Sequence, residues 1–122
     1  MRALVVEQSG TLRCVLHGIL ARRGFDVVEA GDGPQAIALL RRMGDADLVL
    51  ASWELDGSMH PTLLSQLRAY VRRDVAIWVL SPNEPDDAAR RQALMAGAND
   101  WLLTPFTSIQ MEQKLLCAGL LQ

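Results

Sequence analysis

Polar side chains follow the short apolar runs of this sequence, and their types and spacing could do chemistry. One carboxylate, one amide and three hydroxyls stand at these points: Glu7, Gln8, Ser52, Ser81 and Thr104. In an open parallel sheet, ligands and reacting groups collect beyond the carboxyl ends of the strands. If the apolar runs are strands of one such sheet, Ser52 lies at that edge, because it ends the third run.

Five apolar runs of strand length have to position these residues. They are the segments 3–6, 25–29, 48–52, 75–80 and 101–103. Because the runs are nearly continuous in apolar residues, they are typical of strands that are buried on both faces of a parallel sheet.

Segments with helical spacing of apolar residues separate these strands. Their predicted inward-facing stripes include Val15 in the first helix and Tyr70 in the third. Pro34 and Pro61 suit the first turns of the second and third helices, and residues 56–60 are predicted to form a loop. Strand and helix thus alternate five times. This (βα)5 pattern predicts an α/β protein, a three-layer α/β/α sandwich with a five-stranded parallel sheet and right-handed crossovers.

Composition limits the class of protein. A chain of 122 residues, 50% hydrophobic and 21% charged, is typical of one soluble globular domain covering 1–122. The net charge of −2 provides no basic surface for nucleic acid, and no apolar stretch is long enough to span a membrane. Cys14 and Cys117 show neither metal-binding spacing nor a disulfide framework, so a cytoplasmic setting is expected.

Several separated segments, taken in order, resemble the receiver domain of bacterial response regulators, which has the CheY-like, flavodoxin-type fold. Glu7 and Gln8 after the first strand are similar to the family's acidic pair, and residues 29–33 to its turn into the second helix. Residues 96–101 and 104–106 resemble its Ala-Gly-Ala segment and its Lys-Pro-Phe turn. The resemblance implies two-component (phosphorelay) signal transduction, and a signalling protein rather than an enzyme.

In that family, an aspartate that ends the third strand accepts a phosphoryl group, usually from a histidine kinase. The acidic pair helps to hold Mg²⁺, and a Ser/Thr and a Lys bind the phosphoryl oxygens. Phosphoryl transfer needs this cationic compensation and in-line placement.

At the positions that the family uses for phosphorylation, this sequence differs from the family's pattern. Ser52 stands at the phosphoacceptor position, and a hydroxyl cannot form the acyl phosphate. Glu7 and Gln8 replace the acidic pair, which leaves one carboxylate of three, so Mg²⁺ binding is expected to be weak or absent. Thr104 stands at the lysine position, whereas Ser81 keeps the expected hydroxyl. We interpret the site as a degenerate phosphorylation pocket, a hydrogen-bonded polar network with no catalytic residue, no cofactor and at most a residual cation site at Glu7.

Two alternative interpretations stay open. In the first, a kinase still phosphorylates the domain at a substitute residue, either Asp56 on the loop or Ser52 itself. Glu54 lies two residues beyond Ser52, where the family uses only a main-chain carbonyl. In the second, the domain is a small-ligand sensor at the strand ends. No Gly-rich phosphate loop supports this sensor, and Glu7 would oppose an anion.

Protein–protein contact is the function that remains if phosphorylation is lost. The family commonly uses its fourth helix, fifth strand and fifth helix for this purpose, here residues 88–96, Trp101 and the helix from Ser108. Trp101 stands at the switch-aromatic position and is expected to be partner-facing or partly buried. The predicted partners are a histidine kinase, an output domain or a second copy, with no nucleic acid and no membrane. The family also implies a cis bond between Thr104 and Pro105.

Overall fold

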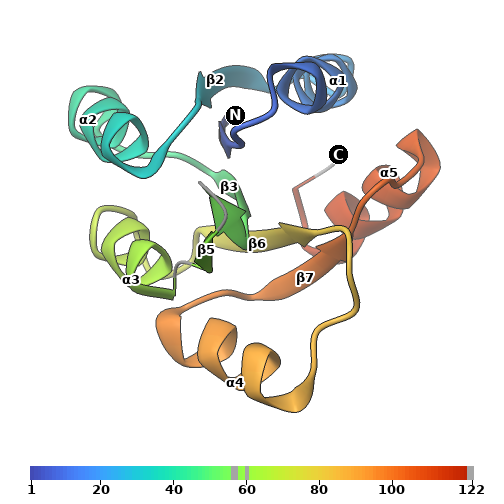
Figure 1. Ribbon diagram of the computed structural model, residues 1–122. Helices are drawn as coiled ribbons and strands as arrows, with labels where there is room; N and C mark the ends of the chain where they lie inside the picture. Colours follow the sequence, from blue (N-terminus) through green and yellow to red (C-terminus); the bar gives the residue numbers. More distant parts are fainter. Residues whose placement is uncertain (56–57, 60, 121–122) are drawn as a thin grey trace.

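Five parallel strands form the central sheet in the order β2-β1-β3-β6-β7 (Figure 1). The computed structural model describes residues 1–55, 58–59 and 61–120. The sheet strands are β1 (Arg2–Val6), β2 (Asp26–Ala30), β3 (Leu48–Ser52), β6 (Ala76–Ser81) and β7 (Asp100–Leu103). The helices are α1 (Gly10–Ala21), α2 (Gly33–Met43), α3 (Pro61–Ala69), α4 (Asp87–Ala96) and α5 (Ser108–Cys117). The predicted fold, a five-stranded parallel sheet in an α/β/α sandwich, is therefore confirmed.

The helices divide into two layers, with α1 and α5 on one face of the sheet and α2, α3 and α4 on the other (Figure 1). Side chains of β3 alternate between the two cores, because successive residues of a strand point to opposite faces. Leu48 and Leu50 pack with α1 and α5, whereas Val49 and Ala51 pack with α2, α3 and α4. β3 is buried along its whole length, which fixes the position of Ser52 at its carboxyl end.

Polar side chains cap the starts of the helices. The carboxylates of Asp32 and Asp86 accept hydrogen bonds from the backbone N–H groups of Gln35 and Ala89, in the first turns of α2 and α4. Such caps satisfy backbone donors that have no partner within the helix. The short loops from strand to helix are therefore held by local hydrogen bonds at the same edge of the sheet as the predicted pocket.

Several details of the sequence prediction were wrong. Val15 and Tyr70 are exposed instead of lying in the apolar stripes of α1 and α3. The Tyr70 hydroxyl accepts hydrogen bonds from the Arg41 guanidinium, at 2.8 and 3.2 Å, which stabilises the ring at the surface. Residues 58–59 form β5 (Ser58–Met59), which pairs with β4 (Glu54–Leu55), where only a loop was predicted. The second strand begins and ends one residue later than predicted.

Candidate functional site

Four neighbouring strands bring the predicted pocket residues to one edge of the sheet. Ser52 and Ser81 are the last residues of β3 and β6. Glu7 and Thr104 follow β1 and β7 directly. The strands are in register at this edge: Ser52 is opposite Leu80 in the β3–β6 pair. The predicted meeting of these residues at the carboxyl ends of the strands therefore follows from the observed topology.

A hydrogen bond between Ser52 and Glu7 forms the centre of the site. The Ser52 hydroxyl donates to Oε2 of Glu7, while Oε1 of the same carboxylate accepts from the backbone N–H of Ser9 at 3.0 Å. Glu7 is 9% exposed and Ser52 is 8% exposed. A buried carboxylate needs donors for its oxygens, and here each oxygen has one. The Ser52–Glu7 hydrogen bond thus links the ends of β1 and β3, and both carboxylate oxygens of Glu7 have a donor.

Ser81 and Thr104 lie at the same edge but make other contacts. The Ser81 hydroxyl donates to the carbonyl of Asn83 at 3.0 Å and accepts from the Asn83 N–H at 3.2 Å. The backbone N–H of Thr104 donates to the carbonyl of Ser81 at 2.9 Å, and the Thr104–Pro105 peptide bond is cis, as predicted. Among the described residues, no hydrogen bond joins either hydroxyl side chain to the Ser52–Glu7 pair. In the part of the chain that the structure describes, the hydroxyls of Ser52 and Ser81 therefore belong to two separate local clusters.

Arg13 of α1 supports the loop that carries the pocket carboxylate, a role that sequence reasoning missed. Its Nη1 donates to the main-chain carbonyls of Glu7 and Gln8, at 2.7 and 3.2 Å. Its Nε donates to Glu29 on β2 at 3.3 Å, and the His17 ring nitrogen Nδ1 lies 2.8 Å from the other oxygen of the same carboxylate. No local pattern in the sequence distinguishes Arg13 from a solvated helix residue, because its partners are main-chain carbonyls of the loop after β1 and a carboxylate on β2.

Trp53 and Trp101 pack against each other on the α4 side of the sheet. Their ring centroids are 5.1 Å apart and their planes are inclined by 51°. Trp53 is buried, while Trp101 is half-buried and packs against the core shared by α2, α3 and α4. Both indole Nε1 atoms are buried without a hydrogen-bond partner among the described residues. The observed environment of Trp53 is thus the packed core on the α4 side of the sheet.

Two acidic residues, Glu54 and Asp56, follow Ser52 closely in the sequence, and the structure describes only the first of them. Glu54 is exposed and makes no hydrogen bond or ion pair with another described side chain. Asp56 lies outside the described residues. Among the described residues, no three His, Cys, Asp or Glu side chains gather into a group that could hold a metal ion.

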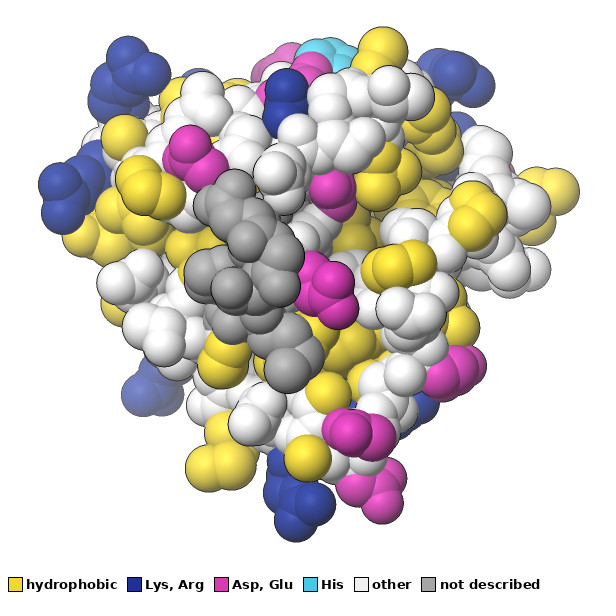
Figure 2. All heavy atoms as spheres, in the orientation of Figure 1, with side chains coloured by type: hydrophobic (Ala, Val, Ile, Leu, Met, Phe, Trp, Pro, Cys, Tyr) yellow, Lys and Arg dark blue, Asp and Glu magenta, His cyan; other side chains and the backbone are white. Residues whose placement is uncertain are grey.

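Charged side chains of both signs are interspersed on the face of the molecule drawn in Figure 2. On the face in Figure 2, Lys and Arg side chains lie apart from one another, with Asp and Glu side chains among them. No helix in the described part of the chain is long and apolar enough to cross a membrane. Arg72 lies among three carboxylates, and the pKa of its guanidinium is raised by a hydrogen bond to Asp74 and by the charge of Asp45. The positive charge of Arg72 is therefore balanced by carboxylates of the same chain, and its position does not indicate an anion-binding site.

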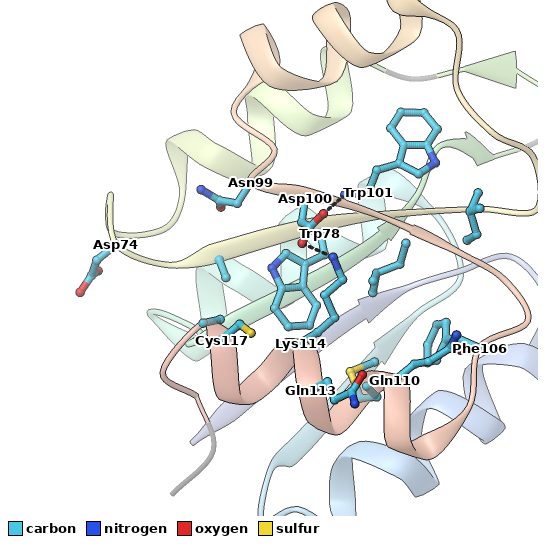
Figure 3. A pocket seen from close by; sticks show the side chains of 15 residues that line it. Asp74, Trp78, Asn99, Asp100, Trp101, Phe106, Gln110, Gln113, Lys114 and Cys117 are labelled. Atoms are coloured by element: carbon cyan, nitrogen blue, oxygen red, sulfur yellow. Dashed lines mark hydrogen bonds and ion pairs between the residues drawn. The ribbon is translucent and has the colours of Figure 1, made fainter.

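A groove of about 740 Å³ lies between β7 and α5 (Figure 3). Lys114 extends from α5 to Asp100 on β7, and its Nζ lies 2.5 Å from the carboxylate oxygen Oδ2. Trp78, which also lines this groove, is almost wholly buried, as its position in a core strand predicts. Among the described lining residues is Trp101 but none of the pocket residues Glu7, Ser52, Ser81 or Thr104. The groove is thus separate from the strand-end site.

Comparisons with known proteins agree with the observed fold. A model of the response regulator receiver domain family matches residues 3–116. The chain is 30% identical over 116 residues to a chemotaxis protein CheY homolog of Campylobacter jejuni, covering 94% of this chain and 89% of that protein.

Two solved structures are also similar. The receiver domain of a sensor histidine kinase from Pseudomonas aeruginosa PAO1 has a TM-score of 0.80 at 27% identity, with 97% of each chain covered. In that structure a magnesium ion is coordinated in the active site cleft. A probable two-component system response regulator/GGDEF domain protein has a TM-score of 0.84 at 25% identity, covering 98% of this chain and 49% of that one.

Proposed function

The chain belongs to the response regulator receiver domain family of two-component signalling, and we propose that it acts by protein–protein contact without phosphorylation of its strand-end pocket. The observation that carries this proposal is the hydrogen bond from the Ser52 hydroxyl to the buried Glu7 carboxylate. It occupies the end of β3, where the family resemblance places the phosphoacceptor aspartate. A serine hydroxyl at this point cannot form the acyl phosphate on which receiver activation depends.

The charges around the pair also oppose phosphoryl transfer. The transferring phosphoryl group carries negative charge that a site must compensate with cations. Thr104 brings no positive charge at the position where the resemblance expects a lysine. Among the described residues, the buried charged side chain at this edge is the negative Glu7. The guanidinium of Arg13 donates its hydrogen bonds to main-chain carbonyls and to the Glu29 carboxylate. A phosphoryl group beside Ser52 would therefore meet repulsion from Glu7.

The donor set does not fit Mg²⁺, the ion that the family implies. Mg²⁺ requires near-octahedral oxygen ligands and is usually held by one or more free carboxylates. Glu7 is the single buried carboxylate at this edge among the described residues, and both of its oxygens accept hydrogen bonds, from Ser9 and Ser52. A magnesium ion would have to break these bonds and would gain one carboxylate ligand. We propose that the pocket keeps the fold of a receiver without binding the ion.

An exposed apolar face supports the protein-contact part of the proposal. We define the α4–β7–α5 face by Leu94 and Met95 of α4, Leu103 of β7 and Ile109 of α5, which are all exposed. Leu94 and Met95 are 68% and 83% exposed, although large apolar side chains usually contribute to the core. We infer an interaction surface from these large exposed apolar side chains, which lie on the edge strand β7 and on the helices at either side of it.

The proposed partners are a histidine kinase, an attached output domain or a second copy of the chain. The similar response regulator/GGDEF protein, of which this chain covers 49%, is an example in which a receiver-like region is part of a longer protein. Light scattering coupled to size exclusion tests the second copy directly. A dimer that Leu94→Asp dissociates would support pairing through the α4–β7–α5 face, while a monomer at all concentrations would exclude it and leave the hetero-partners.

Intact mass measurement tests the loss of phosphorylation. The purified chain 1–122, which we propose to be a single domain, is incubated with acetyl phosphate and Mg²⁺, and in parallel with a histidine kinase. We expect no mass increase by a phosphoryl group and no saturable change in tryptophan fluorescence on Mg²⁺ titration. A phosphorylated species would contradict the proposal, and the variants Ser52→Ala and Asp56→Asn would then show which substitute residue had accepted the group.

A further inference from the structure

Arg68, in the last turn of α3, connects two loops that are distant in the sequence. Its Nη1 donates to the carbonyl of Val75 at 2.8 Å, in the loop that leads from α3 to β6. Its Nη2 donates to the carbonyl of Gly97 and to Oδ1 of Asn99, at 2.7 and 2.8 Å, and its Nε also donates to Gly97 at 3.2 Å. The guanidinium thus bridges the chain after α3 to the chain after α4. Hydrogen bonds from a charged donor are stronger than those between neutral groups.

The local backbone is built around this side chain. Gly97 has φ +110°, and a Cβ at this position would lie 2.9 Å from Cγ of Arg68. A side chain there would therefore be strained and would displace the arginine. Asn99 also accepts from the backbone N–H of Ile77 at 2.8 Å, and its own N–H donates to the carbonyl of Ile77 at 2.7 Å. Arg68, Gly97 and Asn99 consequently form one connected unit, which we call the Arg68 clamp.

Helix α4 buries only small apolar side chains among its described residues, so the hydrogen bonds of the Arg68 clamp contribute strongly to its position. The buried residues of α4 are Ala93 and Ala96, whereas its large side chains Leu94 and Met95 point outward. Two hollows of about 290 Å³ each lie along α4, and Trp101 lines both of them. Small buried side chains and adjacent hollows provide few dispersion contacts. The principal helix contact of α4 is with α3, the helix that carries Arg68.

We propose that Arg68 is the positioning residue for α4 and therefore for the α4–β7–α5 face. The guanidinium fixes the carboxyl end of α4 to the end of α3 and the beginning of β6, and this holds Leu94 and Met95 in place. The consequence for partner binding rests on the proposed function, whereas the effect on α4 itself does not.

Hydrogen exchange of backbone amides, measured on the full chain, tests the positioning of α4. Arg68→Met keeps an apolar stem and removes all the hydrogen bonds, and Arg68→Lys keeps the charge but cannot bridge three acceptors in the same way. In Arg68→Met we expect amides of α4 to exchange about 10- to 100-fold faster, as the loss of one hydrogen bond from a charged donor implies. Amides of β1 and β3 should change by a smaller factor. Arg68→Lys should give an intermediate increase, and it keeps the test valid if the methionine variant does not fold.

A merely structural arginine would change exchange everywhere, and this outcome distinguishes the two roles. If α4, β1 and β3 lose protection by the same factor, or if α4 is unaffected, the positioning role is overturned. Arg41→Met is the matched control, because the Arg41 guanidinium hydrogen-bonds the Tyr70 hydroxyl and, in the part of the chain that the structure describes, has no hydrogen bond or ion pair with α4. This variant should leave exchange in α4 unchanged. Should the protein prove monomeric and without a partner, the proposed docking role fails while the exchange result still decides the role of Arg68.

Discussion

Replacing Ser52 by aspartate places a second carboxylate beside Glu7 and tests whether the pocket has lost its charge compensation. The Ser52 hydroxyl already hydrogen-bonds the Glu7 carboxylate, and both residues are buried. An aspartate at this position would hold its charge about 4 Å from that of Glu7, where two like charges repel by about 4 kcal/mol at an effective dielectric constant of about 20. Uptake of a proton by the pair and small rearrangements reduce this cost. We expect Ser52→Asp to lose about 2–4 kcal/mol in free energy of unfolding.

Urea denaturation at pH 7 without divalent ions measures this loss, with Ser52→Asn as the matched control. Asparagine has the size of aspartate but no charge, so the difference between the two variants isolates the repulsion. The folded carboxylate pair of Ser52→Asp binds a proton more readily than the unfolded chain does. Its stability relative to Ser52→Asn should therefore rise as the pH falls from about 7 to about 5.

Two additions should rescue the aspartate variant. Mg²⁺ would bind between the two carboxylates and stabilise the folded state, by about 1.4 kcal/mol at ten times its Kd. Thr104→Lys would add a positive charge at the same edge of the sheet and recover part of the loss. If Ser52→Asp is as stable as Ser52→Asn at pH 7 and responds to neither addition, the reasoning about charge compensation in this pocket is refuted.

Three further predictions concern the pocket, the apolar face and the tryptophan pair. The triple variant Gln8→Asp, Ser52→Asp, Thr104→Lys should gain a Mg²⁺-dependent mass increase of one phosphoryl group from acetyl phosphate; no gain would mean that the pocket differs from that of active receivers by more than these residues. Leu94→Asp should change the free energy of unfolding by less than about 0.5 kcal/mol in urea denaturation, because the side chain is mostly exposed; a larger loss would show that Leu94 packs within the chain. Trp53→Ala should cost about 3–5 kcal/mol and Trp53→Phe clearly less, and equal losses in thermal unfolding would contradict the role of ring packing.

The fold could be predicted from the sequence because its signals are local and repeated. Apolar runs of three to six residues, separated by helical patterns, predict a buried parallel sheet in which strands and helices alternate. The same logic placed Ser52 at the carboxyl end of a strand, and the resemblance to receiver domains added Glu7, Ser81 and Thr104 at the same edge. Errors arose where a side chain has two compatible environments. Tyr70 fits an apolar stripe, but its hydroxyl has a hydrogen-bond partner at the surface.

The contacts within the site could not be predicted in the same way. Residue types at the strand ends suggested a single polar network, but side-chain directions separate Ser81, which bonds to its own loop, from the Ser52–Glu7 pair. Arg13 and Arg68 were missed because many of their partners are main-chain carbonyls, which any residue type provides, and because their side-chain partners are distant in the sequence. For Arg68, the partners Gly97 and Asn99 are 29 and 31 residues away along the chain.

The pocket lies at the carboxyl ends of the strands and the Arg68 clamp at their amino ends. This separation explains how a receiver could lose phosphorylation and keep protein–protein contact. Ser52 and Ser81 end their strands, whereas Val75 and Asn99 immediately precede β6 and β7. Changes at the carboxyl edge therefore remove charge from the pocket without touching the hydrogen bonds that hold the end of α4. A docking face positioned from the amino edge needs no phosphoryl group to form. If the proposals are correct, Ser52 variants should alter stability and Mg²⁺ response while hydrogen exchange in the last turn of α4 stays close to that of the wild type.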